Sequence, residues 1–97
     1  MSAHLYILRL QSGQLYVGAT TDLDRRWREH QSGEACRTTR LDPPRAIVYT
    51  EEFPSFADAR GREAQIKRWS RAKREALVAR DLDALQRLAQ SHDPRSE

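Results

Sequence analysis

The chain has 97 residues, which is enough for one compact domain and no more. Its single cysteine, Cys36, excludes a disulfide framework and a cysteine-based zinc site, and it favours a reducing cytoplasm. No apolar run is long enough to cross a membrane, and we expect no secretory leader. The net charge of +3 is modest, so its distribution along the chain says more than its total.

Basic residues gather in two segments, 36–45 and 60–80, whereas segments 46–59 and 81–97 carry a net negative charge. Such clustering is typical of a protein that binds the phosphate backbone of a nucleic acid. A solvated helix face rich in arginine has the same composition. Charge alone therefore leaves both interpretations open.

The first elements predicted along the chain are two strands, residues 4–10 and 14–19, rich in β-branched and aromatic side chains. Gly13 lies between them, and it suits the left-handed position of a three-residue hairpin loop. We therefore expect an antiparallel hairpin at the start of the fold.

The register of this hairpin decides which side chains share a face of the sheet. A three-residue loop pairs Leu8 with Tyr16 and Tyr6 with Gly18, so that the two tyrosines project from the same face. Taken alone, two strand tyrosines are ordinary packing residues. Gly18 fits either a bulge or a close approach of a ligand to the backbone.

A helix is predicted over residues 23–31, with an N-cap in segment 20–22 and Gly33 as its terminator. Its apolar face carries two expected core contacts, Leu23 and Trp27. Residues 33–45 contain two prolines and are expected to form a loop, and residues 46–50 a third strand.

Arg26 and His30 lie one turn apart on the face of this helix that also carries the core contacts. A guanidinium fork and an imidazole in that arrangement can address one phosphate. The alternative is an exposed arginine beside a partly buried histidine.

Three further helices are expected in the second half of the chain. Ser55 and Asp58 form a start like a capping box, Ser70 begins a helix through Arg80, and Asp81 caps a last short helix. The first of them places Phe56, Ala59, Glu63 and Ile66 on one stripe, and the last carries Leu82, Leu85 and Leu88.

These elements give an α/β fold in which a small, partly antiparallel three-stranded sheet (the hairpin plus the third strand) is flanked by helices. The predicted order is β-β-α-β-α-α, with room for one more short helix. We expect one domain over residues 1–90 and a disordered polar tail at 91–97.

Glu63 is out of place on a stripe of apolar residues. An unpaired buried carboxylate costs several kcal/mol, so this side chain must be expelled to solvent, paired or bound to a cation. The simplest alternative to a functional role is an ion pair with Lys67, four residues later.

Taken in order, these residues resemble the GIY-YIG nuclease superfamily. The two tripeptides are His4-Leu5-Tyr6 and Tyr16-Val17-Gly18, followed by Leu23-x-x-Arg26-x-x-x-His30 and by Glu63 within segment 62–67. Segment 69–74 is similar to the small stand-alone bacterial members, and the resemblance covers residues 4–80. The chain departs from the family pattern in two ways: His4 stands in place of glycine, and there is no asparagine.

The resemblance implies an endonuclease that hydrolyses phosphodiester bonds in DNA with one Mg²⁺, for which Mn²⁺ substitutes, in repair or recombination. It makes Glu63 the metal ligand and Tyr6 the general base, with Tyr16 orienting the attacking water or sharing the proton. Arg26 clamps the phosphate and favours the phenolate, and His30 donates to a phosphate oxygen or assists proton transfer.

The implied partner is duplex or branched DNA, with no membrane and no small-molecule cofactor. Selectivity then comes from the single domain, a partner protein or a second copy. Flanking phosphates are expected to contact basic side chains in the two basic segments, namely Arg37, Arg40, Arg45, Lys67, Arg71, Lys73 and Arg74.

Two other functions fit the sequence. One is a non-catalytic nucleic-acid-binding module on the same scaffold, which has no use for paired tyrosines or Glu63. The other is a protein–protein adaptor that docks through Trp69 and the basic helix. Cys36 and His92 are interpreted as bystanders in every case.

Overall fold

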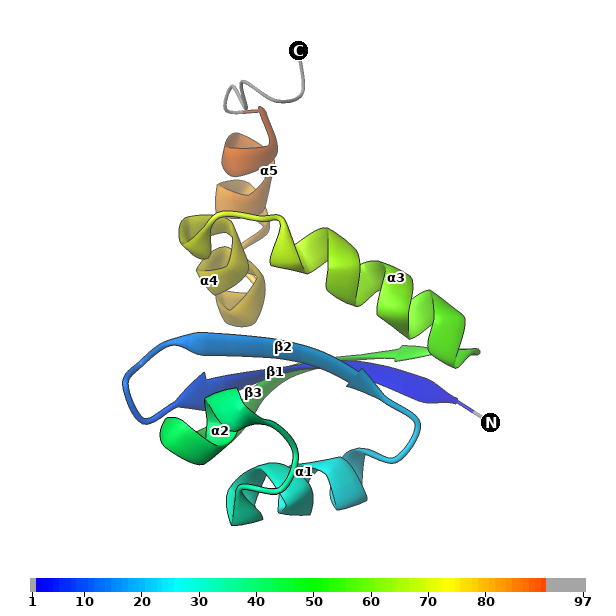
Figure 1. Ribbon diagram of the computed structural model, residues 1–97. Coiled ribbons are helices and arrows are strands. Elements are labelled where there is room, and N and C mark those ends of the chain that lie inside the picture. Colours follow the sequence, from blue (N-terminus) through cyan, green and yellow to red (C-terminus); the bar gives the residue numbers. More distant parts are fainter. Residues whose placement is uncertain (1, 91–97) are drawn as a thin grey trace. The chain divides into compact units, whose positions relative to one another are not determined.

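The computed structural model of the protein describes residues 2–90 (Figure 1). The described residues form two compact units, which divide after Lys67, and each is described by itself. The prediction of one domain over residues 1–90 stays a prediction. The tail at 91–97, predicted to be disordered, lies outside the described residues.

The first unit begins with the predicted hairpin, formed by β1 (Ala3–Leu10) and β2 (Leu15–Thr20). The strands are antiparallel, and Tyr6 lies directly opposite Gly18, so the predicted register is confirmed. Gly13 adopts the left-handed conformation that the loop requires, with φ at +93°.

The third strand, β3 (Pro44–Phe53), completes a sheet with strand order β2-β1-β3. It is antiparallel to β1, so both strand pairs are antiparallel. The strand is longer than the predicted residues 46–50 because β1 pairs with it along its whole length. Near the end of β3, Oε1 of Glu51 accepts a hydrogen bond of 2.9 Å from Nε of Arg62.

One face of the sheet is covered by α1 (Leu23–Ser32), as predicted. Asp22 caps the helix by accepting a 3.0 Å hydrogen bond from the backbone N–H of Arg25, and Gly33 ends it with φ at +83°. Leu23 and Trp27 of α1 pack against the buried side chains of β1, so both predicted core contacts are confirmed.

A short helix, α2 (Arg37–Leu41), lies in the segment predicted to be a loop. The element order is therefore β-β-α-α-β-α-α-α: α2 is the unexpected element, and the last helix is the additional one for which the predicted order left room. Two adjacent threonines give this segment low helix propensity, which is why the sequence pattern missed it. Thr39 is only 1% exposed, which indicates that tertiary contact rather than propensity stabilises the turn.

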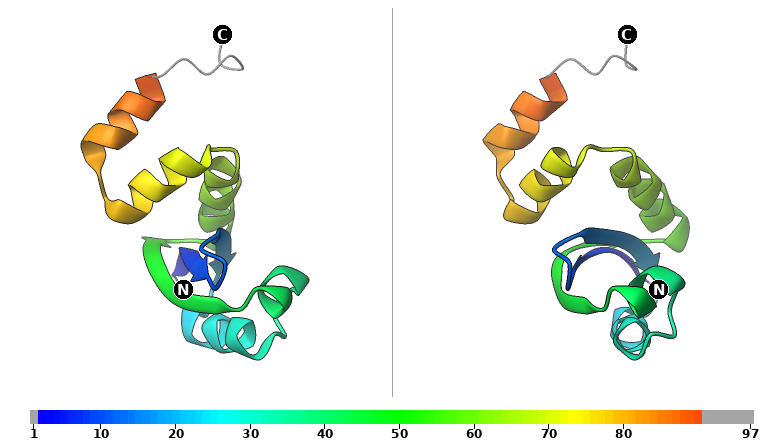
Figure 2. Two further views of the ribbon diagram at one scale, coloured as in Figure 1. Left: turned by 90° about the vertical axis from the view of Figure 1, so that its left-hand side faces the viewer. Right: turned by 60° about the vertical axis from the view of Figure 1, so that its left-hand side comes forward.

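The opposite face of the sheet is covered by α3 (Phe56–Lys67). The sheet therefore has α3 on one side, and α1 and α2 on the other (Figures 1 and 2). Ala59 and Ile66 are fully buried, as the stripe predicts. Phe56 was expected in the same core, but this prediction is wrong because its side chain is 41% exposed. It occupies the first turn of the helix, at the rim of a pocket described below.

The second unit contains α4 (Arg71–Ala79) and α5 (Leu82–Gln90). Ser70 and Asp81 cap these helices by accepting hydrogen bonds from the backbone N–H of Lys73 and of Ala84, as predicted. Between residues 2 and 90, no helix combines the length and apolarity that a membrane span needs.

Candidate active site

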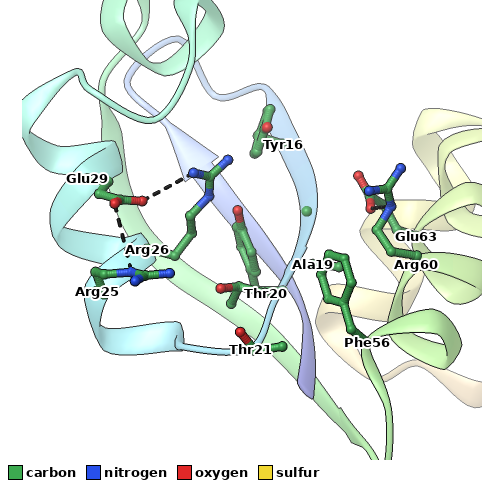
Figure 3. A pocket seen from close by; sticks show the side chains of 12 residues that line it. Tyr16, Ala19, Thr20, Thr21, Arg25, Arg26, Glu29, Phe56, Arg60 and Glu63 are labelled. Atoms are coloured by element: carbon green, nitrogen blue, oxygen red, sulfur yellow. Dashed lines mark hydrogen bonds and ion pairs between the residues drawn. The ribbon is translucent and has the colours of Figure 1, made fainter. Parts of the chain in front are cut away.

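A pocket of about 370 Å³ opens in the first unit beside β2, which is an edge strand of the sheet. Four of the five predicted catalytic side chains line it, namely Tyr6, Tyr16, Arg26 and Glu63. They come from β1, β2, α1 and α3, so residues far apart in the sequence meet here. Figure 3 shows the arginine of α1 on one side of β2 and the glutamate of α3 on the other.

Tyr6 reaches this pocket because Gly18 has no side chain. A Cβ built on Gly18 would lie 2.5 Å from Cζ of Tyr6, which is a severe overlap. The glycine therefore makes room for the phenol and forms no bulge in the regular β1–β2 register. Tyr6 is almost fully buried, although it is part of the pocket lining.

His30 lies behind Tyr6 and not in the pocket lining. Its side chain is 0% exposed, Nε2 lies 2.8 Å from the Tyr6 hydroxyl, and Nδ1 lies 2.8 Å from Oγ1 of Thr39. Burial, and then the charge of nearby Arg26, lower the pKa of His30 to about 4, so the imidazole is neutral. Both ring nitrogens of His30 are engaged by protein hydroxyls, and its predicted contact with a phosphate stays a prediction.

Tyr6 is a neutral phenol in the free protein. Burial raises its pKa, and the neighbouring Arg26 guanidinium lowers it only in part. Arg26 thus acts in the direction that its expected role requires, although burial is the larger effect, and the role of Tyr6 as general base stays a prediction. Arg26 is itself oriented by Glu29, whose Oε1 accepts a 3.1 Å hydrogen bond from Nη1.

Cys36, interpreted from the sequence as a bystander, contacts the site. Its sulfur lies 3.6 Å from the hydroxyl oxygen of Tyr16 and 3.5 Å from Oγ1 of Thr39. Burial raises the pKa of this thiol, but its hydrogen bonds with Thr39 and Tyr16 outweigh burial and lower the pKa below its usual value. Burial also raises the pKa of Tyr16, and the contact with Cys36 raises it further.

Glu63 is paired rather than expelled to solvent. Its carboxylate oxygens lie 3.2 Å from Nε of Arg60 and 2.7 Å from Nζ of Lys67, and its side chain is 13% exposed. The ion pair with Lys67, given above as the simplest alternative to a functional role, is thus present. Glu63 nevertheless faces the pocket that holds both tyrosines.

The family is decided by comparison with known proteins. A family model described as the GIY-YIG catalytic domain matches residues 2–76. The chain belongs to the GIY-YIG family. A GIY-YIG catalytic domain is in general a nuclease domain. The resemblance inferred from the sequence is therefore confirmed.

Curated relatives of this GIY-YIG chain carry the name UPF0213 protein. One from Halobacterium salinarum is 42% identical over 74 residues, which is 76% of this chain and 96% of the relative. One from Natronomonas pharaonis is 45% identical over 76 residues, which is 78% of this chain and 89% of the relative. Their shared name states no activity.

Two solution NMR structures have the same fold. A UPF0213 protein from Bacillus halodurans is 41% identical, with a TM-score of 0.55, and the match covers 84% of this chain and 86% of that one. A protein from E. faecalis is 34% identical, with a TM-score of 0.56 over 81% of this chain and 84% of that one. Both likenesses agree with the predicted α/β fold.

The GIY-YIG pocket also contains residues that the sequence analysis missed. Arg25 and Arg60 line it beside the predicted residues, and Phe56 forms part of its rim with Arg60 5.7 Å from its ring centre (Figure 3). Arg60 lies three residues before Glu63, so helical spacing was the signal that could have found it.

The residues predicted to bind flanking phosphates lie outside the GIY-YIG pocket. Arg37, Arg40 and Arg45 are exposed, on α2 and β3. Lys67 is the last residue of α3 and is paired with Glu63. The remaining predicted residues belong to the second unit, namely Arg71, Lys73 and Arg74. Lys73 lies 4.2 Å from the ring centre of Trp69. Their contacts with DNA stay predictions.

Proposed function

We propose that this chain is a divalent-metal-dependent endonuclease that hydrolyses phosphodiester bonds in DNA, in repair or recombination. The observation that supports the proposal most is the meeting of two phenols, a guanidinium and a carboxylate in one open pocket. Four separate elements must fold together to bring them there. A module that only binds nucleic acid has no need of this combination.

The pocket suits Mg²⁺ better than a metal bound entirely by protein. Within residues 2–90 no three His, Cys, Asp or Glu side chains gather as metal ligands. Mg²⁺ commonly takes one or two carboxylates and completes its shell with water and phosphate, so Glu63 alone is sufficient. When bound, the ion supplies positive charge that neutralises the phosphate and the leaving oxygen.

Binding of the phosphate, removal of a proton and positioning of the attacking water are the roles of the protein's own residues. Arg26 faces the pocket and carries the fork of donors that holds a phosphate oxygen as negative charge develops. Tyr6 is the general base: its oxygen lies beside that guanidinium, which favours loss of the phenol proton. Burial opposes this ionisation, so the base requires the additional positive charge that a loaded active site contains. Tyr16 lies on the same wall and orients the attacking water.

Cleavage of a panel of linear and branched DNAs tests the proposal. The wild-type chain is expected to cut at least one of them with Mg²⁺ or Mn²⁺ and none with a chelator. Glu63→Gln should lower the rate on the order of 10²-fold or more with an unchanged circular dichroism spectrum. Glu52→Gln, which removes the same charge from an exposed position on β3, should cut normally.

A non-catalytic nucleic-acid-binding module is the second candidate. One observation favours it: both oxygens of Glu63 are engaged by basic side chains, and those ion pairs compete with a metal. This candidate predicts salt-sensitive DNA binding without cleavage at any divalent metal, and equal binding by wild type and Glu63→Gln. That outcome would contradict the endonuclease.

A further inference from the structure

A continuous series of hydrogen bonds runs behind the pocket from one catalytic tyrosine to the other. Tyr6 contacts His30 at 2.8 Å, and His30 contacts Thr39 at 2.8 Å. Thr39 contacts the sulfur of Cys36 at 3.5 Å, and that sulfur lies 3.6 Å from the Tyr16 hydroxyl. Two members of this series, Thr39 and Cys36, come from α2 and the residue before it.

The imidazole in the middle of the series has two distinct nitrogens. His30 is buried and neutral, so one ring nitrogen carries a hydrogen and donates while the other accepts. The hydrogen bonds of the series can therefore run in two directions, which differ in which group donates and which accepts. In one, Nε2 accepts from Tyr6 and Nδ1 donates to Thr39; in the other, both bonds are reversed.

Arg26 favours the first direction. A guanidinium only donates, and Arg26 lines the pocket together with Tyr6, so its positive charge favours a Tyr6 hydroxyl that turns its oxygen, and not its hydrogen, toward Arg26. The hydrogen of Tyr6 then points to the ring nitrogen Nε2 of His30. Nδ1 of His30 carries the remaining hydrogen and donates it to Oγ1 of Thr39.

The same direction continues to the second tyrosine. Because Oγ1 of Thr39 accepts from His30, its own hydrogen is available for the sulfur of Cys36, and the thiol donates to the oxygen of Tyr16. The hydrogen of Tyr16 is then left outside the series. Since Tyr16 lines the pocket, that hydrogen is available to a water or phosphate there.

We propose that Thr39 is a positioning residue that holds His30 in the Nδ1–H tautomer, so that His30 accepts a hydrogen bond from Tyr6. Cys36 extends this role by occupying the Tyr16 oxygen from behind. The catalytic part of the proposal rests on the nuclease function proposed above. Neither Thr39 nor Cys36 is among the residues that line the pocket, and their hydrogen bonds lead to His30 and Tyr16, so they act through the tyrosines and not on the substrate.

The position of α2 supports this role. The sequence gives the segment no reason to be helical, yet it folds into a single helical turn that directs a buried hydroxyl at His30. Val at position 39 would have nearly the same shape as Thr but no hydroxyl. A tight turn that required only packing would accept either residue.

The tautomer is measured directly by NMR on the ¹⁵N-labelled full chain, from the two ring nitrogens of His30. We expect Nδ1 to resonate as the protonated nitrogen and Nε2 as the unprotonated one. A protonated Nε2 in the wild-type chain would overturn the proposal. This measurement needs no DNA and no cleavage, so it decides the direction even if the nuclease function fails.

Three threonine variants complete the test. Thr39→Val should abolish the preference for Nδ1–H, whereas Thr39→Ser should retain it. Thr38→Val makes the same change at the exposed neighbouring position of α2 and should leave His30 unaltered. Retention of Nδ1–H in Thr39→Val would show that Thr39 does not set the tautomer, and the proposal would be wrong.

Kinetics test whether the position of the tyrosines depends on this hydroxyl. Thr39→Val should lower kcat by about 10- to 100-fold with an unchanged KM, because it alters Tyr6 without touching the substrate. Thr39→Ser should restore most of the rate. Equal kcat in Thr39→Val and wild type would limit Thr39 to a structural role and contradict the catalytic part of the proposal.

Discussion

Gly18 and Tyr6 face each other across the β1–β2 ladder, and the phenol occupies the space that a side chain on Gly18 would fill. Cζ of Tyr6 would lie 2.5 Å from a Cβ at position 18. The phenol reaches the pocket and His30 only because this space is free. The glycine of the second tripeptide thus determines where the hydroxyl of Tyr6, the proposed general base, lies.

Gly18→Ala should displace Tyr6 and impair the site. We expect destabilisation of about 1–3 kcal/mol from the overlap, and a loss of cleavage on the order of 10²-fold because the hydroxyl moves. Urea denaturation and a cleavage assay measure the two effects. Gly61→Ala is the matched control: a Cβ there has nothing within 4 Å, and in a helix it should stabilise the chain by about 0.5–1 kcal/mol. Normal cleavage by Gly18→Ala would contradict the steric argument.

Tyr6→Phe should remove the base and leave the fold largely intact. Loss of the hydroxyl leaves Nε2 of His30 without its 2.8 Å partner, which costs about 1–3 kcal/mol, and cleavage should fall on the order of 10²-fold or more. Tyr49→Phe makes the same change outside the pocket, where the hydroxyl contacts Glu51, and should not alter cleavage. Single-turnover rates at saturating DNA distinguish the two; near-normal turnover by Tyr6→Phe would remove the residue from the mechanism.

His30 should make the chain less stable in mild acid. Its folded pKa of about 4 lies below the usual 6.5, so between these values the unfolded chain binds a proton that the folded chain does not. The stabilisation that His30 contributes is fully present above its pKa in the unfolded chain, 6.5. It is lost as the pH falls toward its pKa in the folded chain, about 4. The free energy of unfolding should drop by about 2 kcal/mol between about pH 7.5 and about pH 5 because of this residue.

Urea denaturation of wild type and His30→Gln at both pH values isolates that contribution. The variant has no imidazole at position 30, so its free energy of unfolding should change by about 2 kcal/mol less over the same pH interval. An identical change in the two proteins would show that His30 titrates normally in the folded chain.

The pair of Arg62 and Glu51 should anchor α3 to β3. Nε and Nη2 of the arginine donate to both carboxylate oxygens at 2.9 and 3.1 Å, and neither side chain is more than about a quarter exposed. Arg62→Met leaves this carboxylate half-buried without that partner and should destabilise the chain by about 1–3 kcal/mol. Arg28→Met, at an exposed position on α1, should stay within about 0.5 kcal/mol of wild type. Thermal unfolding of both variants measures the difference, and equal midpoints would show that the pair contributes nothing.

The sequence by itself determined the parts of this protein that depend on neighbouring residues. The hairpin register follows from the loop length and Gly13, and the helix ends follow from capping residues such as Asp22, Gly33 and Ser70. These features form from contacts within a few residues, so a local pattern is sufficient to predict them. The order of motifs along the chain also identified the GIY-YIG family before any coordinates.

Tertiary structure alone decided what the predicted catalytic side chains contact. Phe56 fits a buried stripe by spacing, but its helix begins at the pocket rim and exposes it. His30, Thr39 and Cys36 are ordinary in the sequence, and only packing of α1 and α2 against the sheet joins them to the tyrosines. The periodicity of a sequence predicts which face of a helix or strand a residue occupies. The residue that it contacts depends on which distant segment of the folded chain packs against that face.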